Sequence, residues 1–175
     1  ILNKKNIIKN IQGLARKARY EILSNYCRKN NVSTLLTAHK FEDQVETFFI
    51  RLSRGSGLKG LSSMSPLSKL GNKIELYRPL LETKKKFLIK ISKTIFGTYF
   101  KDPSNKSEKY LRTKVRNLKK PLENSGIKYE QIFKSIQNLS LSKMTLDGYL
   151  NKIFKKLIKK SNKEILINFS KYKNL

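Results

Sequence analysis

The chain has 175 residues, of which 38% are hydrophobic, so it carries enough apolar surface to bury a core and does not read as a disordered chain. Its 39 lysines and arginines against 12 aspartates and glutamates give a net charge of +27, which attracts polyanions and makes nucleic acid the first partner to consider. No apolar run approaches the roughly twenty residues of a membrane span, and the single cysteine, Cys27, excludes an internal disulfide and a Cys-x-x-Cys metal site. We therefore expect a protein of the cytoplasm, or of an organellar matrix or stroma, with Cys27 packed on a helix. Compositional drift toward lysine and asparagine is a second source of the charge excess.

The first part of the chain alternates helix, strand and helix. Residues 5–29 carry apolar side chains at steps of three and four, which predicts an amphipathic helix. An asparagine pair then indicates a turn, and residues 32–38 form a short apolar, β-branched run typical of a buried parallel strand. A second helix is expected over residues 41–54, ended by Gly55 in a left-handed cap. This order predicts an α/β layer with a parallel sheet.

The middle of the chain is rich in turn residues. Residues 55–71 contain many glycines and serines and predict a loop with one helical turn. The stretch "KIELYRPLL" predicts a short strand that Pro79 ends. Apolar residues at helical spacing then predict a helix over residues 83–96.

The last part of the chain is expected to be helical and very basic. A helix is predicted to begin at Ser104 or Asn105, and we place a domain boundary between Gly97 and Asp102. Residues 1–98 and 99–175 would then be separate domains. Two apolar stripes at helical spacing are predicted in the second: Ile132, Phe133, Ile136 and Leu139, then Leu150, Ile153, Phe154 and Leu157.

Three of the acidic residues, Glu42, Asp43 and Glu46, fall within five positions of this basic chain. On a helical wheel at about 100° per residue, Asp43 and Glu46 lie one turn apart and opposite the apolar side, so neither is expected in the core. Because their helix follows a parallel strand, they are expected at the edge where open α/β sheets bind ligands, just after His39. Glu42 points elsewhere and is expected to be solvated.

Each of these residues also has a purely structural explanation. Acidic side chains in a first helical turn stabilise the helix dipole without any ligand, and Arg51 and Arg54 would cap the other end of the same helix. A lone histidine such as His39 is often a hydrogen-bonded structural residue. Arg112 and Arg116 fit an exposed helical charge pattern, and "DPSN" at residues 102–105 is ordinary turn and cap chemistry.

The ordered string is more specific than its parts. "AHKFEDQVETFFIRLSRGSGLKGLSSM", from Ala38, resembles the HxxDDQxETxxxRLxRGxGxxGL signature of tRNA(Ile)-lysidine synthases, a family of the PP-loop ATP pyrophosphatase superfamily. The sequence departs from that signature at Glu42, where the family usually has aspartate, and at Lys40, where it often has histidine. Three further motifs follow the family's order within residues 12–122: "ARKARY" at 15–20, "YRPLL" at 77–81 and "DPSNKSEKYLRTKVR" at 102–116.

The resemblance implies a fold and an activity. Residues 1–98 would be the C-terminal part of a PP-loop ATP-binding domain of the Rossmann-like, adenine nucleotide alpha hydrolase-like kind, and residues 99–175 a helical domain that recognises tRNA. The family is a tRNA-modifying ligase that uses ATP to adenylate the C2 oxygen of the wobble cytidine in tRNA(Ile) with a CAU anticodon. It then joins the ε-amine of free lysine to C2 and releases AMP, which changes decoding from AUG to AUA.

The resemblance also implies roles for particular residues. We expect Asp43 and Glu46 to act in catalysis by holding the lysine ammonium, with Asp43 also a candidate Mg²⁺ ligand beside ATP. A pocket lined by carboxylates suits a cationic substrate even in a basic protein. Arg19 and Arg112 complete the expected catalytic set.

The remaining expected contacts involve nucleotide and RNA. A guanidinium offers paired donors to phosphate oxygens, and backbone amides of glycine turns cradle anions. We expect nucleotide binding by His39, Arg54, Gly55 and Gly57, and tRNA binding by Arg112, Lys114 and Arg116. No membrane partner is expected, and a homodimer is a candidate assembly.

The superfamily's SGGxDS loop, which binds the ATP phosphates, does not occur in these residues, and the chain opens at Ile1 inside a lysine-rich helical pattern. We therefore expect a fragment of a longer synthase, inactive by itself. Two alternatives stay open at this point. A non-catalytic basic RNA-binding remnant would explain the charge but not the carboxylates, and a tRNA thiolase of the same superfamily would commonly use a cysteine pair.

Overall fold

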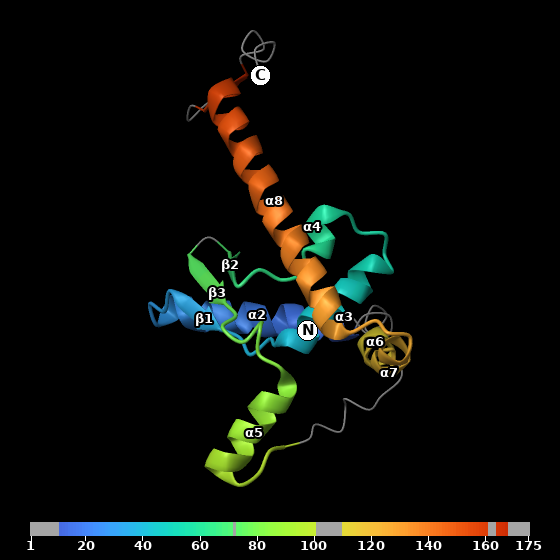
Figure 1. Ribbon diagram of the computed structural model, residues 1–175. Coiled ribbons are helices and arrows are strands. Elements are labelled where there is room, and N and C mark those ends of the chain that lie inside the picture. Colours follow the sequence, from blue (N-terminus) through green and yellow to red (C-terminus); the bar gives the residue numbers. More distant parts are fainter. Residues whose placement is uncertain (1–10, 72, 101–109, 161–163, 168–175) are drawn as a thin grey trace. The chain divides into compact units, whose positions relative to one another are not determined.

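The computed structural model describes residues 11–71, 73–100, 110–160 and 164–167 (Figure 1). The chain divides into two compact units. The first unit comprises Ile1–Phe41 and Ser65–Ile91, and the second comprises Glu42–Met64 and Ser92–Leu175. None of the helices in the described ranges combines the length and apolarity that a membrane crossing requires.

A small mixed sheet organises the first unit. Strand β1 (Thr34–Leu36) pairs in parallel with β3 (Ile74–Tyr77), and β2 (Leu67–Leu70) pairs antiparallel with the other edge of β3. The strands predicted around residues 32–38 and 73–81 are therefore confirmed, whereas the sheet in the described part of the chain is mixed, so the predicted parallel sheet stays a prediction. Strand β2 lies in the segment 55–71 that we predicted to be a loop. Its sequence "LSKL" includes serine and lysine, which did not indicate a strand, but its residues alternate between exposed and half-buried.

Helix α2 (Ile11–Lys29) precedes the sheet and ends where the asparagine pair predicted a turn. Asn31 has a positive φ of 54°, and the amide of Val32 donates to the carbonyl oxygen of Cys27 at 2.8 Å. This closes the helix in the way a left-handed residue usually does. Cys27 is 3% exposed, which confirms its packing role.

The burial of β1 differs from our expectation. Leu36 is 63% exposed and only the central Leu35 is half-buried, so the prediction of a buried strand is wrong for the described part of the chain. The apolar content of the segment predicted its strand character correctly. Burial of a parallel strand, however, requires layers on both faces of the sheet, and a single segment carries no information about those layers.

The second unit is mainly helical. It contains α3 (Phe41–Leu52) from its second residue onward, the single turn α4 (Leu58–Leu61), α6 (Leu111–Asn117), α7 (Lys119–Asn124) and the long α8 (Tyr129–Leu157). Helix α5 (Lys85–Phe96), which confirms the helix predicted over 83–96, runs from the first unit into the second. The helix start predicted at residues 104–105 lies outside the described residues.

The core of the second unit lies along the first half of α8. Ile132 and Ile136 are 9% and 2% exposed, and α4 packs against α8, which confirms the first predicted stripe. The second stripe is more exposed, with Phe154 at 52%. After α8 the chain forms an antiparallel pair of short strands, β4 (Ile158–Lys160) and β5 (Ile165–Ile167), where we had expected helix.

Candidate active site

Helix α3 carries two polar faces in its buried first half. Asp43, Gln44 and Glu46 are 8%, 5% and 3% exposed, and they surround the fully buried Val45. Because residues one turn apart share a face, Asp43 and Glu46 lie together, whereas Gln44 shares its face with Arg51. Each face holds a different part of the second unit.

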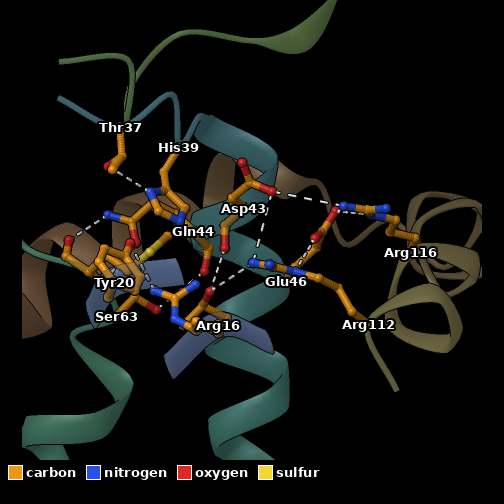
Figure 2. Close-up of polar contacts among 12 residues, drawn as sticks. Arg16, Tyr20, Thr37, His39, Asp43, Gln44, Glu46, Ser63, Arg112 and Arg116 are labelled. Atoms are coloured by element: carbon orange, nitrogen blue, oxygen red, sulfur yellow. Dashed lines mark hydrogen bonds and ion pairs between the residues drawn. The ribbon is translucent and has the colours of Figure 1, made fainter. Parts of the chain in front are cut away.

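The first face forms an ion-pair cluster with α6 (Figure 2). Thr113 and Val115 are the buried residues of α6, and Arg112 and Arg116, four positions apart, both reach the carboxylates. Glu46 Oε1 accepts a hydrogen bond from Arg116 Nε at 2.6 Å, and Glu46 Oε2 lies 2.8 Å from Arg112 Nε. Asp43 Oδ1 lies 3.9 Å from Nη2 of each arginine.

The burial of these carboxylates corrects our expectation that they lie outside the core. A helical wheel places a side chain opposite the apolar stripe but does not show that a second helix covers that side. Burying a carboxylate is costly unless a counter-charge and hydrogen bonds accompany it, and the arginines of α6 supply both. The arginines, with side chains 34% and 33% exposed, are thus not the free surface charges that an exposed helical pattern suggested.

Two neighbouring groups show the electrostatics of this cluster. Burial lowers the pKa of Arg116, but the hydrogen bond that it donates to Glu46 and the charges of Glu46 and Asp43 outweigh burial and raise that pKa above its usual value. Tyr129, at the start of α8, is 3% exposed, and burial together with the charge of Glu46 raises its pKa to about 12. Its hydroxyl has no hydrogen-bond partner among the described residues.

The second face of α3 holds the glycine-rich loop that follows the helix. Gln44 Nε2 donates to the carbonyl oxygen of Met64 at 2.7 Å, and Gln44 Oε1 accepts from the amide of Met64 at 2.8 Å. Arg51 Nη1 donates to the carbonyl oxygens of Gly60 and Ser63, both at 2.8 Å, and burial lowers its pKa. Arg51 therefore holds the loop that follows α3, a role beyond the helix capping expected from the sequence.

The predicted left-handed cap at Gly55 is confirmed by its φ of 67°. The amide of Gly55 donates to Leu52 and that of Ser56 donates to Arg51, which together satisfy the last carbonyls of α3. An anion cradled by this loop would have to use amides other than these two. Gly57 begins α4 with extended backbone, and Arg54 is exposed.

Two of the predicted residues, Arg19 and His39, line one hollow of about 290 Å³ in the first unit. The hollow lies between α2 and the carboxyl end of β1, and Arg16, Tyr20 and Thr37 also contribute to it. Thr37 Oγ1 and His39 Nδ1 are hydrogen-bonded at 3.0 Å, and the guanidinium of Arg16 lies 5.0 Å from the ring centroid of Tyr20 (Figure 2). A cationic and aromatic lining at this edge suits a nucleotide or a base.

A larger hollow of about 690 Å³ lies at the opposite, amino end of β1 and includes Cys27, Ser33 and Ile74 in its lining. Open α/β sheets bind ligands at the carboxyl ends of their strands, so its size alone does not make it the better candidate. The smaller hollow has the more suitable position and chemistry.

The structure thus brings Asp43, Glu46, Arg112 and Arg116 together in the second unit, and Arg19 and His39 in the first. Lys114 is exposed on α6. No three histidine, cysteine or acidic side chains gather into a metal-binding group among the described residues. Two residues of interest, Gln44 and Tyr129, were missed from the sequence, and Arg51 was given only a capping role. Gln44 and Arg51 belong to the quoted signature, but Tyr129 has no signal beyond an aromatic residue at a helix start.

With this geometry in place, the comparison with known proteins gives the class. Residues 2–122 match the model of the PP-loop domain, and the chain belongs to that family. This agrees with the parallel pairing of β1 and β3 between helices.

The chain is also similar to proteins named tRNA(Ile)-lysidine synthase. It is 48% identical to that of Wolbachia pipientis wMel over 134 residues, which cover 75% of this chain and 31% of the relative. For Orientia tsutsugamushi the identity is 47% over 118 residues, covering 67% and 26%. For Histophilus somni it is 34% over 167 residues, covering 94% and 38%. The chain therefore spans about a third of the length of these relatives.

Proposed function

We propose that this chain is part of a tRNA(Ile)-lysidine synthase and carries the amine-binding part of its active site. The full-length enzyme would transfer AMP from ATP to the C2 oxygen of the wobble cytidine, releasing pyrophosphate. The ε-amine of free lysine would then attack C2, lose a proton, and displace AMP. The name that the relatives share and the family membership of residues 2–122 both support this activity.

The observation that carries the proposal is the buried pair Asp43 and Glu46. In a chain with a net charge of +27, two carboxylates kept at 8% and 3% exposure beside the arginines of α6 are the groups that would receive a cationic substrate. Lysine is such a substrate. Mg²⁺ beside Asp43 is a further proposal, since this ion is often held by one or two carboxylates together with substrate phosphates.

We assign nucleotide contacts to two places. Arg19 and His39 would contact ATP or the cytidine from the hollow at the end of β1, and Arg54 with Gly57 would contact phosphates from the glycine-rich loop. Gly55 would serve that loop through its backbone conformation. Arg112, Lys114 and Arg116 would contact tRNA phosphates.

The division into residues 1–98 and 99–175 also remains our proposal, with the first part completing a Rossmann-like parallel sheet in the longer enzyme and the second recognising tRNA. Of the alternative activities, sulfur transfer is disfavoured because the one cysteine of the chain is 3% exposed. Cytoplasmic or organellar location and a homodimer are kept as expectations of the proposal.

The test is lysidine formation by the full-length protein. The protein is incubated with ATP, L-lysine and a tRNA(Ile) transcript with a CAU anticodon, and the digested nucleosides are analysed by mass spectrometry. Asp43→Asn should lower turnover at least about a hundredfold, because it removes charge from the amine site. The matched control Asp147→Asn removes an exposed carboxylate of α8 and should leave turnover unchanged. Unchanged turnover in Asp43→Asn would refute the assignment.

A further inference from the structure

The ion-pair cluster raises a question of access. Asp43 and Glu46 face Arg112 and Arg116, so two negative side chains already meet two positive ones. An ammonium ion that approaches this cluster finds no excess negative charge. Lysine can use the carboxylates only if a counter-ion leaves them or shares them.

The two arginines are held unequally. Arg116 Nε donates a hydrogen bond of 2.6 Å to Glu46 Oε1. Arg112 Nε lies 2.8 Å from Glu46 Oε2, but its N–H is not directed at that oxygen, and neither atom has a hydrogen-bond partner among the described residues. The other contacts of Arg112 are long, 3.4 Å from Nη2 to Thr47 Oγ1 and 3.9 Å from Nη2 to Asp43 Oδ1. Arg112 is the counter-ion that loses less by moving.

Arg112 is also within reach of an anion. Its side chain is 34% exposed, whereas that of Glu46 is 4% exposed. A phosphate group that meets the solvent side of Arg112 can form charge-assisted hydrogen bonds with it, since a guanidinium presents paired donors. Those bonds would compete directly with the misaligned contact to Glu46.

We propose that Arg112 is an exchangeable counter-ion: a phosphate-bearing ligand draws its guanidinium away from Glu46, and Glu46 Oε2 then accepts an N–H of the substrate ammonium. Arg116 stays on Oε1 and keeps the carboxylate oriented. This inference rests on the proposed function and makes amine binding conditional on the phosphate ligand. The coupling is reciprocal, so lysine must strengthen binding of the phosphate ligand by the same factor.

The phosphate can come from the nucleotide or from the RNA backbone, and the experiment separates these sources. L-lysine is titrated into the full-length protein by isothermal titration calorimetry, first alone, then with saturating inorganic tripolyphosphate, and then with tRNA(Ile). We expect one of these anions to raise the affinity for lysine by about tenfold, within the usual range of coupling between two sites. A response to tripolyphosphate identifies the nucleotide as the source, and a response to tRNA alone identifies the RNA.

Two variants test the role of Arg112 itself. Arg112→Gln removes the counter-ion, so its lysine affinity without any anion should rise to that of the anion-bound wild type, and the anion should no longer change it. A residue that bound lysine or only supported the fold would give lower affinity instead. Arg112→Lys keeps the charge and should keep part of the coupling, while melting temperatures verify that both variants fold.

The matched control is Lys120→Gln, which removes one positive charge from an exposed position on α7 and should leave the coupling unchanged. Equal lysine affinity of the wild type with and without both anions would overturn the inference and leave the proposed function intact. Absence of lysine binding under every condition would overturn both.

Discussion

The two polar faces of α3 hold their partners in different ways. Gln44 and Arg51 bind the main chain of the following loop, at Gly60, Ser63 and Met64. Asp43 and Glu46 bind the tips of long side chains from α6. Main-chain partners can leave only if the loop unfolds, whereas a guanidinium can leave by rotation about its own side-chain bonds. One helix therefore combines a fixed frame, the loop contacts of Gln44 and Arg51, with an adjustable charge cluster, the ion pairs of Asp43 and Glu46.

The largest effect on stability is expected at the centre of the charge cluster. Glu46→Ala removes the carboxylate whose oxygens lie 2.6 and 2.8 Å from the two arginines, whereas Asp43 Oδ1 is 3.9 Å from each of them. Removing one partner from a buried ion pair should lower the free energy of unfolding by about 3 kcal/mol, measured by urea denaturation. Glu123→Ala, which breaks an exposed i, i+4 pair with Lys119, should cost less than about 1 kcal/mol. Equal losses in the two variants would mean that the cluster is not a buried one.

Breaking the fixed frame should lower the free energy of unfolding almost as much. Arg51→Ala removes two hydrogen bonds of 2.8 Å and leaves the carbonyl oxygens of Gly60 and Ser63 without this donor. We expect a loss of about 2.5 kcal/mol, because hydrogen bonds from a charged donor are stronger than neutral ones. Arg54→Ala, at an exposed position three residues later, should stay within about 0.5 kcal/mol of the wild type in the same denaturation experiment.

Tyr129 gives the cluster a signature at alkaline pH. Its pKa is raised to about 12, while an unfolded tyrosine ionises near pH 10, so the folded state holds one more proton between these values. Stability should therefore fall as the pH rises from 10 to 12, by about 2 kcal/mol. In Tyr129→Phe this contribution should be absent. The measurement compares unfolding free energies of the two proteins at pH 9 and pH 12, and parallel declines would contradict the assignment.

The smallest effect is expected at the end of α3. Gly55 has a φ of 67°, and an alanine in this left-handed conformation should cost about 1 kcal/mol. Gly57 has a φ of −80°, which any residue adopts, so Gly57→Ala should be nearly neutral for the same measurement. A larger loss of unfolding free energy in Gly57→Ala than in Gly55→Ala would show that the left-handed cap does not stabilise the end of α3.

Predictions from the sequence were correct where residues close together in the chain determine the local structure. Gly55 predicted its left-handed cap, and Ile132 and Ile136 predicted the buried side of α8 by spacing alone. The strand character of β1 followed from the apolar, β-branched residues of its own segment. In each of these cases neighbouring residues decide the outcome.

Predictions from the sequence failed where contacts between distant parts of the chain determine burial or secondary structure. Asp43 and Glu46 are buried because α6, some seventy positions away, brings arginines to them. No wheel drawn on α3 contains that information. Likewise, Leu67 to Leu70 became a strand because β3 offered an edge, although its own residues favoured a loop. The role of Tyr129 depends on the same kind of distant contact.

The sheet of the first unit has a consequence for how the chain is made. Strand β2 pairs with β3 through residues as close as Leu70 and Ile74, whereas β1 pairs with β3 through Thr34 and Glu75, 41 positions apart. Hairpins close in microseconds, but distant pairing must first overcome the entropy of closing a long loop. On the ribosome, β1 emerges well before its partner. The edge of β1 that pairs with β3 therefore waits for its partner until about forty more residues have been synthesised, at the usual elongation rate a matter of seconds.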